Sequence, residues 1–226
     1  MASVVKFTTV NYPESDGKPM GETDVHIGEI IRLRELLKRF YAGQTVYVSA
    51  DLLVFYEQGN PKKFVVPDVF VVKGLQPGDR RNYKLWYERK PPDAIIEVTS
   101  RKTRKKDMVD KPALYGRLQV PEYFLFDPTL EYLEPQLQGH RLIGGQYVPI
   151  AADAAGALVS EQLRLRLCVE GGHLGLYRLD TGERLLTDAE ALRAEAEARQ
   201  AEAEARQAAE AEVARLRDQL RRRDST

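Results

Sequence analysis

Two acidic residues lie inside segments that otherwise have the pattern of buried strands, and this placement restricts how the chain can fold. Asp68 follows Pro67 in the run FVVPDVFVVK, and Glu97 lies within AIIEVT. A carboxylate in such surroundings is costly unless it is paired, hydrogen-bonded or bound to a metal. If the two strands are neighbours, both carboxylates can face one cation, for which Mg²⁺ is suited and Mn²⁺ is a substitute. The alternative is a pair of acids at strand ends that loop amides satisfy.

The periodicity of the apolar residues predicts a domain of mixed helix and strand. A helix is expected over residues 23–41, where apolar side chains recur at intervals of three and four. A second helical segment, residues 105–118, contains Pro112 and lies between two expected strands, which predicts a parallel crossover. The fold class is therefore α/β or α+β. Strands are expected at residues 45–55, 64–73, 94–99, 122–127, 142–150, 164–170 and 174–178.

A basic run follows the strand that carries Glu97, and it could bind the phosphates of a nucleic acid beside a metal. The alternative is a solvated basic loop. Lys111 and Tyr115 are four residues apart and share a helical face, and Lys111 could turn toward the carboxylates or lie on the surface. The candidate nucleic-acid contacts are Ser100, Arg101, Lys102, Arg104, Lys105 and Lys106.

Composition narrows the class of protein. The 34 Lys and Arg residues balance 34 Asp and Glu residues, which argues against a strongly basic protein that coats nucleic acid. The single cysteine, Cys168, excludes an intramolecular disulfide and a cysteine-rich zinc site. No apolar run approaches the roughly 20 residues of a membrane span, and no signal-peptide core is present. We therefore expect a cytoplasmic protein without membrane contact.

The C-terminal segment has a seven-residue repeat, because AEAEARQ occurs at residue 194 and again at residue 201. This period is typical of a coiled coil, and the expected seam is mostly alanine. Thr187 and Glu190 have the spacing of a capping box, which predicts a helix start near Asp188. The chain thus divides into a globular domain, residues 1–186, and a helix, residues 187–226. That helix is either a homodimer zipper, a lone solvated helix or a docking segment for another helical partner.

The globular part contains four motifs: Pro67-Asp68, Glu97-Val98-Thr99-Ser100, Asp107-x-x-x-Lys111-x-x-x-Tyr115 and the block VPEYFLFDP at residues 120–128. Together they resemble the Uma-type "putative restriction endonuclease" family of the PD-(D/E)XK nuclease superfamily. His26 and the segment at residues 181–185 extend the similarity over most of the globular part. Apart from the resemblance, the residue pattern of His26 indicates a surface or packing residue.

The resemblance implies a restriction-endonuclease-like fold, with a mixed central sheet flanked by helices, and Mg²⁺-dependent hydrolysis of DNA by a homodimer. Asp68 and Glu97 would hold the metal, and Glu29 in the first helix could join them. The superfamily places a lysine two residues after the glutamate, but this sequence has Thr99 there. The resemblance implies that Lys111 supplies the lysine from the following helix, with Lys105 and Lys106 as the other candidates.

Two functions follow as competing hypotheses. The first is a metal-dependent DNA endonuclease that uses Asp68, Glu97 and Lys111 as its catalytic set. The second is a catalytically silent nuclease fold that serves as a nucleic-acid-binding or assembly module, which the threonine at position 99 and the neutral net charge favour.

Overall fold

The structure is a computed structural model that describes residues 10–17, 23–100 and 106–223. The chain divides into two compact units, with the boundary between Leu185 and Leu186. Within the described residues, no helix is both long and apolar enough to cross a membrane.

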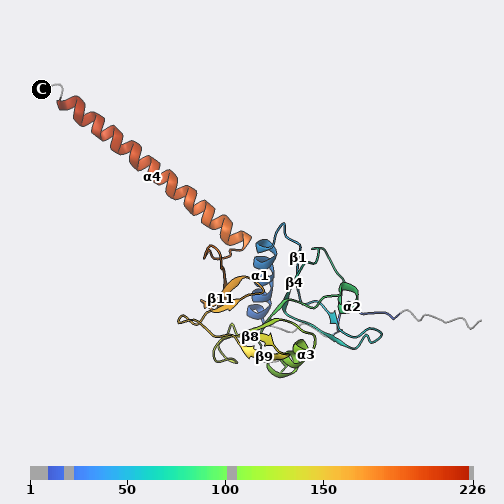
Figure 1. Ribbon diagram of the computed structural model, residues 1–226. Coiled ribbons are helices and arrows are strands. Elements are labelled where there is room, and N and C mark those ends of the chain that lie inside the picture. Colours follow the sequence, from blue (N-terminus) through green and yellow to red (C-terminus); the bar gives the residue numbers. More distant parts are fainter. Residues whose placement is uncertain (1–9, 18–22, 101–105, 224–226) are drawn as a thin grey trace, which may run out of the picture. The chain divides into compact units, whose positions relative to one another are not determined.

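A six-stranded mixed sheet forms the centre of the first unit (Figure 1). Its order is β1-β4-β6-β7-β8-β9; β6 and β7 are parallel, and all other neighbours are antiparallel. This pairing confirms both the expected crossover and the predicted fold class. The strands are β1 (Val46–Ala50), β4 (Val69–Lys73), β6 (Ala94–Val98), β7 (Glu122–Phe126), β8 (Leu137–Ile143) and β9 (Gln146–Pro149).

Apolar layers cover both faces of the central sheet. On one face α1 (Asp24–Phe40) buries three leucines between β1 and a second sheet of β10 (Leu158–Ser160), β11 (Leu165–Glu170) and β12 (His173–Arg178). Figure 1 shows α1 between β11 and the β1–β4 pair. The opposite face packs against α3 (Lys111–Arg117) and the small sheet of β2 (Val54–Phe55), β3 (Phe64–Val65) and β5 (Tyr83–Lys84). A short helix, α2 (Leu85–Glu88), follows β5.

The alternation of side chains along β6 decides which layer each residue joins. Ile96 and Val98 lie in the core beneath α1, whereas Ile95 lies in the core beneath α3. Successive residues of a strand point to opposite faces, so Glu97 faces the α3 layer with Ile95. This arrangement directs the buried carboxylate toward the helix that follows.

After residues 101–105, the segment between β6 and β7 continues with a π-helical turn, η1 (Lys106–Asp110), which leads directly into α3. Pro112 lies in the first turn of α3, where its missing N–H is not needed. The helical segment expected at residues 105–118 therefore contains a junction between two helical forms. Lys111 is the first residue after this junction.

Some expected strands are divided or shifted. The strand expected at residues 45–55 breaks at Asp51, whose φ is 48°. The prediction of one strand at residues 142–150 is wrong, because Gly144 and Gly145 adopt positive φ and form the turn of the β8–β9 hairpin. The hydrophobic pattern alone does not indicate this turn. The short elements β5, α2 and β10 were not predicted, because each is too short to show a period.

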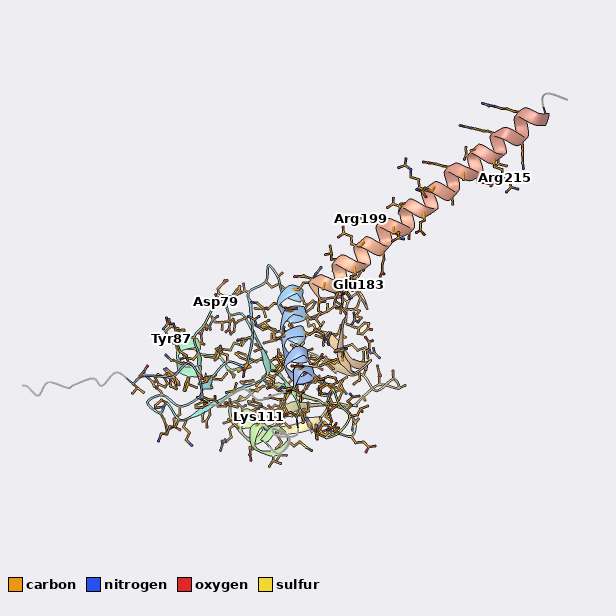
Figure 2. All side chains as sticks on the ribbon, turned by 180° about the vertical axis from the view of Figure 1, so that it is seen from behind. Asp79, Tyr87, Lys111, Glu183, Arg199 and Arg215 are labelled. Atoms are coloured by element: carbon orange, nitrogen blue, oxygen red, sulfur yellow. The ribbon has the colours of Figure 1, made fainter. Side chains whose placement is uncertain are left out.

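The second unit is a single long helix, α4 (Asp188–Arg223). Its start confirms the predicted capping box: the Glu190 carboxylate accepts from Thr187 N at 2.8 Å, and Thr187 Oγ1 accepts from Glu190 N at 3.2 Å. Side chains such as Arg199 and Arg215 extend away from the helix (Figure 2). Several apolar side chains of α4 are exposed: Leu192, Val213 and Leu216.

Glu122, at the start of β7, joins three parts of the domain although its side chain is fully buried. Its Oε1 accepts from Arg141 of β8 at 2.9 Å and from the Glu161 amide at 3.1 Å. Its Oε2 accepts from the Ser160 hydroxyl and from the Gln162 amide at 3.0 Å. These donors satisfy a carboxylate that burial would otherwise make very costly.

We expect Glu122→Ala to lower the free energy of unfolding by about 3–5 kcal/mol, because it leaves a partly buried guanidinium and two amides without their acceptor. Urea unfolding of the full chain measures this change. The matched control is Glu161→Ala: its carboxylate also pairs with Arg141, at 2.7 Å, but is 64% exposed. That variant should lose less than about 1 kcal/mol. Equal losses in the two variants would contradict the role assigned to Glu122.

Candidate active site

Asp68 and Glu97 are held together by the backbones of two neighbouring strands. The register pairs Val69 of β4 with Ile96 of β6, so the next position along places the two acids opposite each other. Asp68 N donates to Glu97 Oε2 at 3.1 Å, and Val98 N donates to Asp68 Oδ2 at 2.7 Å. Each carboxylate therefore accepts an N–H from the other strand. Sheet pairing, rather than flexible side-chain contacts, fixes the separation of the acids.

Two side chains of α3 complete the surroundings of Glu97. Lys111 Nζ donates to Glu97 Oε2 at 2.7 Å, and Tyr115 Oη donates to Oε1 at 2.6 Å. The donors are four residues apart, which places both on the helical face that packs on the sheet. The Glu97 side chain is 0% exposed and that of Lys111 is 13% exposed. Figure 2 locates Lys111 at α3. The structure thus brings together all three residues of the expected catalytic set.

Asp107 is a third buried carboxylate beside the same lysine. Lys111 Nζ lies 2.9 Å from Asp107 Oδ1, one helical turn away, and the Asp107 side chain is fully buried. Tyr123 of β7 donates its hydroxyl proton to the Asp107 backbone carbonyl, which anchors the π-turn to the sheet. The four-residue spacing of Asp107, Lys111 and Tyr115 is the sequence signal for this contact, because it places the three side chains on one helical face.

His26 contacts the site from α1, on the other side of the strands. The helix begins at its cap residue Thr23, whose hydroxyl accepts from His26 N at 3.3 Å. His26 Nε2 donates to the Val98 carbonyl at 2.7 Å and lies 3.7 Å from Asp68 Oδ2. The expectation of a surface or packing residue is therefore incomplete, because this buried ring also faces a site carboxylate. Helix periodicity cannot reveal such a contact between distant segments.

The charges of the site act strongly on one another. Burial raises the pKa of Glu97 to about 8, and the nearby carboxylates of Asp68 and Asp107 add to this rise against the opposing attraction of Lys111. Burial would also raise the pKa of Asp68, but Lys111 and His26 outweigh it and hold this pKa below the usual value. Burial disfavours a charged Lys111, yet the surrounding carboxylates raise its pKa, so the ammonium form persists at neutral pH.

The residues present fit a divalent cation that retains part of its water shell. Among the described residues, no hydrogen bond reaches Oδ1 of Asp68, whose side chain is 13% exposed. Thr99, two positions after Glu97, has a buried hydroxyl with no hydrogen-bond partner in the described part of the chain. No ready-made group of three or more His, Cys, Asp or Glu ligands occurs within that part. Mg²⁺ suits such a site, because it commonly binds one or two carboxylates and keeps several waters.

Glu29, the third expected metal ligand, lies in a separate group of interactions. Its oxygens accept from Arg32 at 2.8 and 2.9 Å, from the Leu174 amide at 2.9 Å and from His173 Nδ1 at 2.8 Å. These contacts tie α1 to β12. Burial opposes ionisation of Glu29, but Arg32 and the Leu174 amide outweigh it, and the pKa is lowered. The structure therefore does not bring Glu29 together with Lys111.

The expected nucleic-acid contacts lie only partly within the described residues. Ser100 lies two residues after the end of β6 and is partly buried. For Lys106, the structure describes the backbone at the start of η1. The remaining residues of the basic run lie outside the described ranges: Arg101, Lys102, Arg104 and Lys105.

Similar proteins occur among solved structures and among known protein families. One similar solved structure is titled "a putative nuclease belonging to DUF820" and comes from Anabaena variabilis. It is 12% identical, with a TM-score of 0.46 over 65% of this chain and 76% of the other. No curated protein matches the sequence. A family model, Uma2, described as "Putative restriction endonuclease", matches residues 17–182. That match spans most of the chain, and the protein therefore belongs to the Uma2 family.

Proposed function

We propose that this protein is a divalent-metal-dependent endonuclease that hydrolyses phosphodiester bonds of DNA. The observation that carries the proposal is the 2.7 Å contact between Lys111 Nζ and Glu97 Oε2, with Asp68 on the adjacent strand. It unites two carboxylates and a lysine although position 99, where the superfamily has its lysine, is a threonine. Membership of a nuclease family supports the same reaction class.

Each residue of the site has a distinct part in this proposal. A bound Mg²⁺ or Mn²⁺ would polarise the scissile phosphate and lower the pKa of an attacking water. Asp68 and Glu97 would hold that cation, and Tyr115 fixes the orientation of Glu97 through its hydrogen bond. Lys111 is charged, so it would stabilise negative charge that develops on the phosphate rather than remove a proton. The contacts of Glu29 to Arg32, His173 and Leu174 lead us to leave it out of the metal site.

The proposed DNA substrate rests on the basic run after β6. This segment follows Glu97 within a few residues, so cations there could bind phosphates that flank the scissile bond. The contacts proposed are Ser100, Arg101, Lys102, Arg104, Lys105 and Lys106. Such a local group suits a chain whose net charge is zero better than a broad basic surface does.

We expect Asp68→Asn, Glu97→Gln and Lys111→Met each to lower the rate of DNA cleavage by about 100-fold or more, because each removes a charge that acts in the transition state. Nicking of supercoiled plasmid in Mg²⁺ or Mn²⁺ measures the rate. Lys38→Met, at an exposed lysine of α1, is the matched control and should cleave like the parent. Equal cleavage by the parent and the three site variants would favour the catalytically silent alternative.

We expect Mn²⁺ to raise the melting temperature, with an effect that grows as the pH rises. The pKa of Glu97 is raised to about 8, so below this pH the cation must displace a proton. The affinity should then increase by up to about tenfold per pH unit between about pH 6 and pH 8. Isothermal titration calorimetry measures it, and Glu97→Gln should abolish the pH dependence. Affinity that stays constant over this range would contradict the displaced proton.

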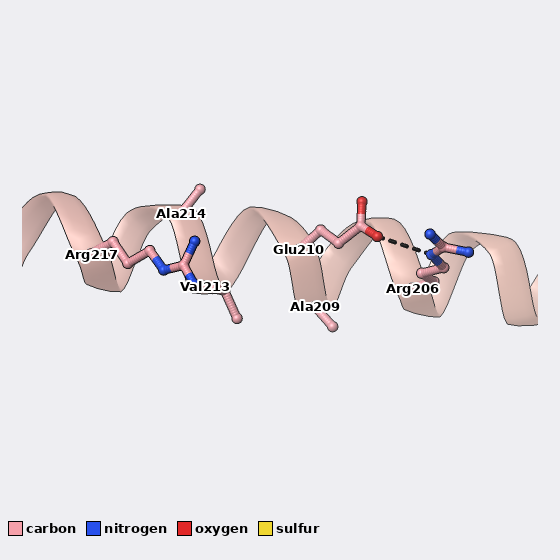
Figure 3. Close-up of a pocket in the computed structure, with 6 residues that line it drawn as sticks. All are labelled: Arg206, Ala209, Glu210, Val213, Ala214 and Arg217. Atoms are coloured by element: carbon pink, nitrogen blue, oxygen red, sulfur yellow. Dashed lines mark hydrogen bonds and ion pairs between the residues drawn. The ribbon is translucent and has the colours of Figure 1, made fainter.

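We also propose that α4 forms a homodimer through its seam of small and apolar residues. Figure 3 shows Ala209 and Val213 on one side of the helix and Ala214 on another, with an Arg206–Glu210 ion pair of 2.9 Å alongside. Val213 and Leu216 are about half exposed within α4, and a second copy would bury them. The proposed seam consists of Ala194, Ala198, Ala201, Ala205, Ala209, Val213, Leu216 and Leu220. The last three positions of this seam are apolar and larger than alanine. This end of the helix therefore carries most of the apolar area available for pairing.

We expect the full chain to be dimeric and the double variant Val213→Glu, Leu216→Glu to be monomeric, because like charges would meet in the seam. Light scattering after size exclusion measures the mass. Ala211→Glu is the matched control, since residue 211 lies on the opposite side of the helix from residue 213. A fragment that ends near Leu186 and still dimerises would show that the contact lies elsewhere. A monomeric parent would favour a solvated helix or a different helical partner.

A further inference from the structure

The number of buried carboxylates around Lys111 exceeds what one ammonium can balance. Asp68, Glu97 and Asp107 have side chains that are 13%, 0% and 0% exposed. Ionised, the three carry three negative charges, and Lys111 offsets one. His26 lies 3.7 Å from Asp68 and offsets a second charge only when it is protonated; beside a neutral His26, a divalent cation would supply the remaining two positive charges. Partial burial and the Asp68 carboxylate raise the pKa of Asp51, but Asp51 is exposed to solvent and is not counted with the buried group. The buried part of the site thus has the charge suited to a lysine and a divalent cation together.

The two cations would share one ligand. Lys111 Nζ already contacts Glu97 Oε2, the same carboxylate that the proposed function assigns to the metal. Two positive groups a few ångströms apart repel each other strongly in a buried site, where the effective dielectric is low. A cation that binds Glu97 therefore weakens the hold of this residue on Lys111. Without another anchor, the ammonium would move away from the place where it is needed.

Asp107 has the geometry of such an anchor. Its Oδ1 lies 2.9 Å from Lys111 Nζ, and the four-residue spacing places the two side chains on one face. Its backbone carbonyl accepts from the Tyr123 hydroxyl of β7, which restrains the π-turn against the sheet. The carboxylate is fully buried, so separating Lys111 from it would leave the negative charge of Asp107 unpaired in the protein interior, which is energetically costly.

We propose that Asp107 is a positioning residue that keeps Lys111 in the site when Glu97 is engaged by a divalent cation. This inference rests on the proposed function for the identity of the cation. Asp107 acts through Lys111 and need not touch the metal or the DNA. One consequence can be tested without metal. After the charge of Glu97 is lost, the ion pair with Asp107 should by itself keep Lys111 in its position.

The experiment measures how fast the Lys111 amine of the full-length protein reacts with acetic anhydride, by quantitative mass spectrometry. Glu97→Gln imitates the loss of the carboxylate charge to a cation, and Asp107→Asn removes the proposed anchor. Two lysines serve as internal references. Lys38 is exposed, and Lys73, whose Nζ donates to Gln162 at 2.7 Å, reports any loss of the fold.

Lys111 should react slowly in the parent and remain slow in Glu97→Gln. In Glu97→Gln, Asp107→Asn it should react roughly tenfold faster or more, because the ion pair between Lys111 and the buried Asp107 carboxylate is lost. The matched control is Glu97→Gln, Tyr115→Phe, which removes a different hydrogen bond of the same face and should leave Lys111 protected.

Two results would overturn the proposal. One is a Lys111 that reacts as fast as Lys38 in Glu97→Gln, since Asp107 would then fail to hold it. This result needs no Asp107 variant, so it decides the matter even if Asp107→Asn does not fold. The other is an unchanged rate in the double variant while Lys73 stays protected. None of these measurements requires cleavage or metal, so a failure to cleave DNA would contradict the nuclease function separately.

Discussion

The site depends on two hydrogen bonds between β4 and β6, in which a backbone N–H at each strand donates to the acidic side chain of the other. Asp68 N binds Glu97, and Val98 N binds Asp68, so each strand provides both an acid and a donor. Both donors are backbone N–H groups that the sheet already holds in place, so only the two acidic side chains have to be ordered to form these hydrogen bonds. They also lower the cost of burying two like charges side by side, which no apolar neighbour could do.

The lysine that joins these acids comes from a different kind of element. With threonine at position 99, the strand cannot present an ammonium, and Lys111 reaches Glu97 from the start of α3 instead. Its place is determined by a helix that must pack correctly on the sheet. Tyr115 contributes to that packing and binds Glu97 with its hydroxyl. One helical face therefore supplies both the charge and the orientation of the carboxylate.

Much of this arrangement could be predicted because it follows from local patterns. Alternation within β6 fixed the face of Glu97, and the apolar runs predicted the neighbouring strands. The contacts of His26 could not be predicted, since they join α1 to β6 across 72 residues. Glu29 is one turn beyond His26, which made it a candidate ligand, but Arg32 and His173 bind it instead. The spacing of two residues on a helix indicates that they share a face, but it does not determine which residues of other elements they contact.

The residues of the site on η1 and α3 can move away from the sheet independently of the acids on the strands, because they lie on one short segment around the junction of the two helices. Asp107 lies before the junction, Lys111 directly after it and Tyr115 one turn further on, while the acids of the strands stay fixed. A local opening of this short segment would remove the ammonium and its anchor in one step and leave the six-stranded sheet intact. The protein could thus lose the contacts between Lys111 and the carboxylates by local unfolding of η1 and α3, without global unfolding.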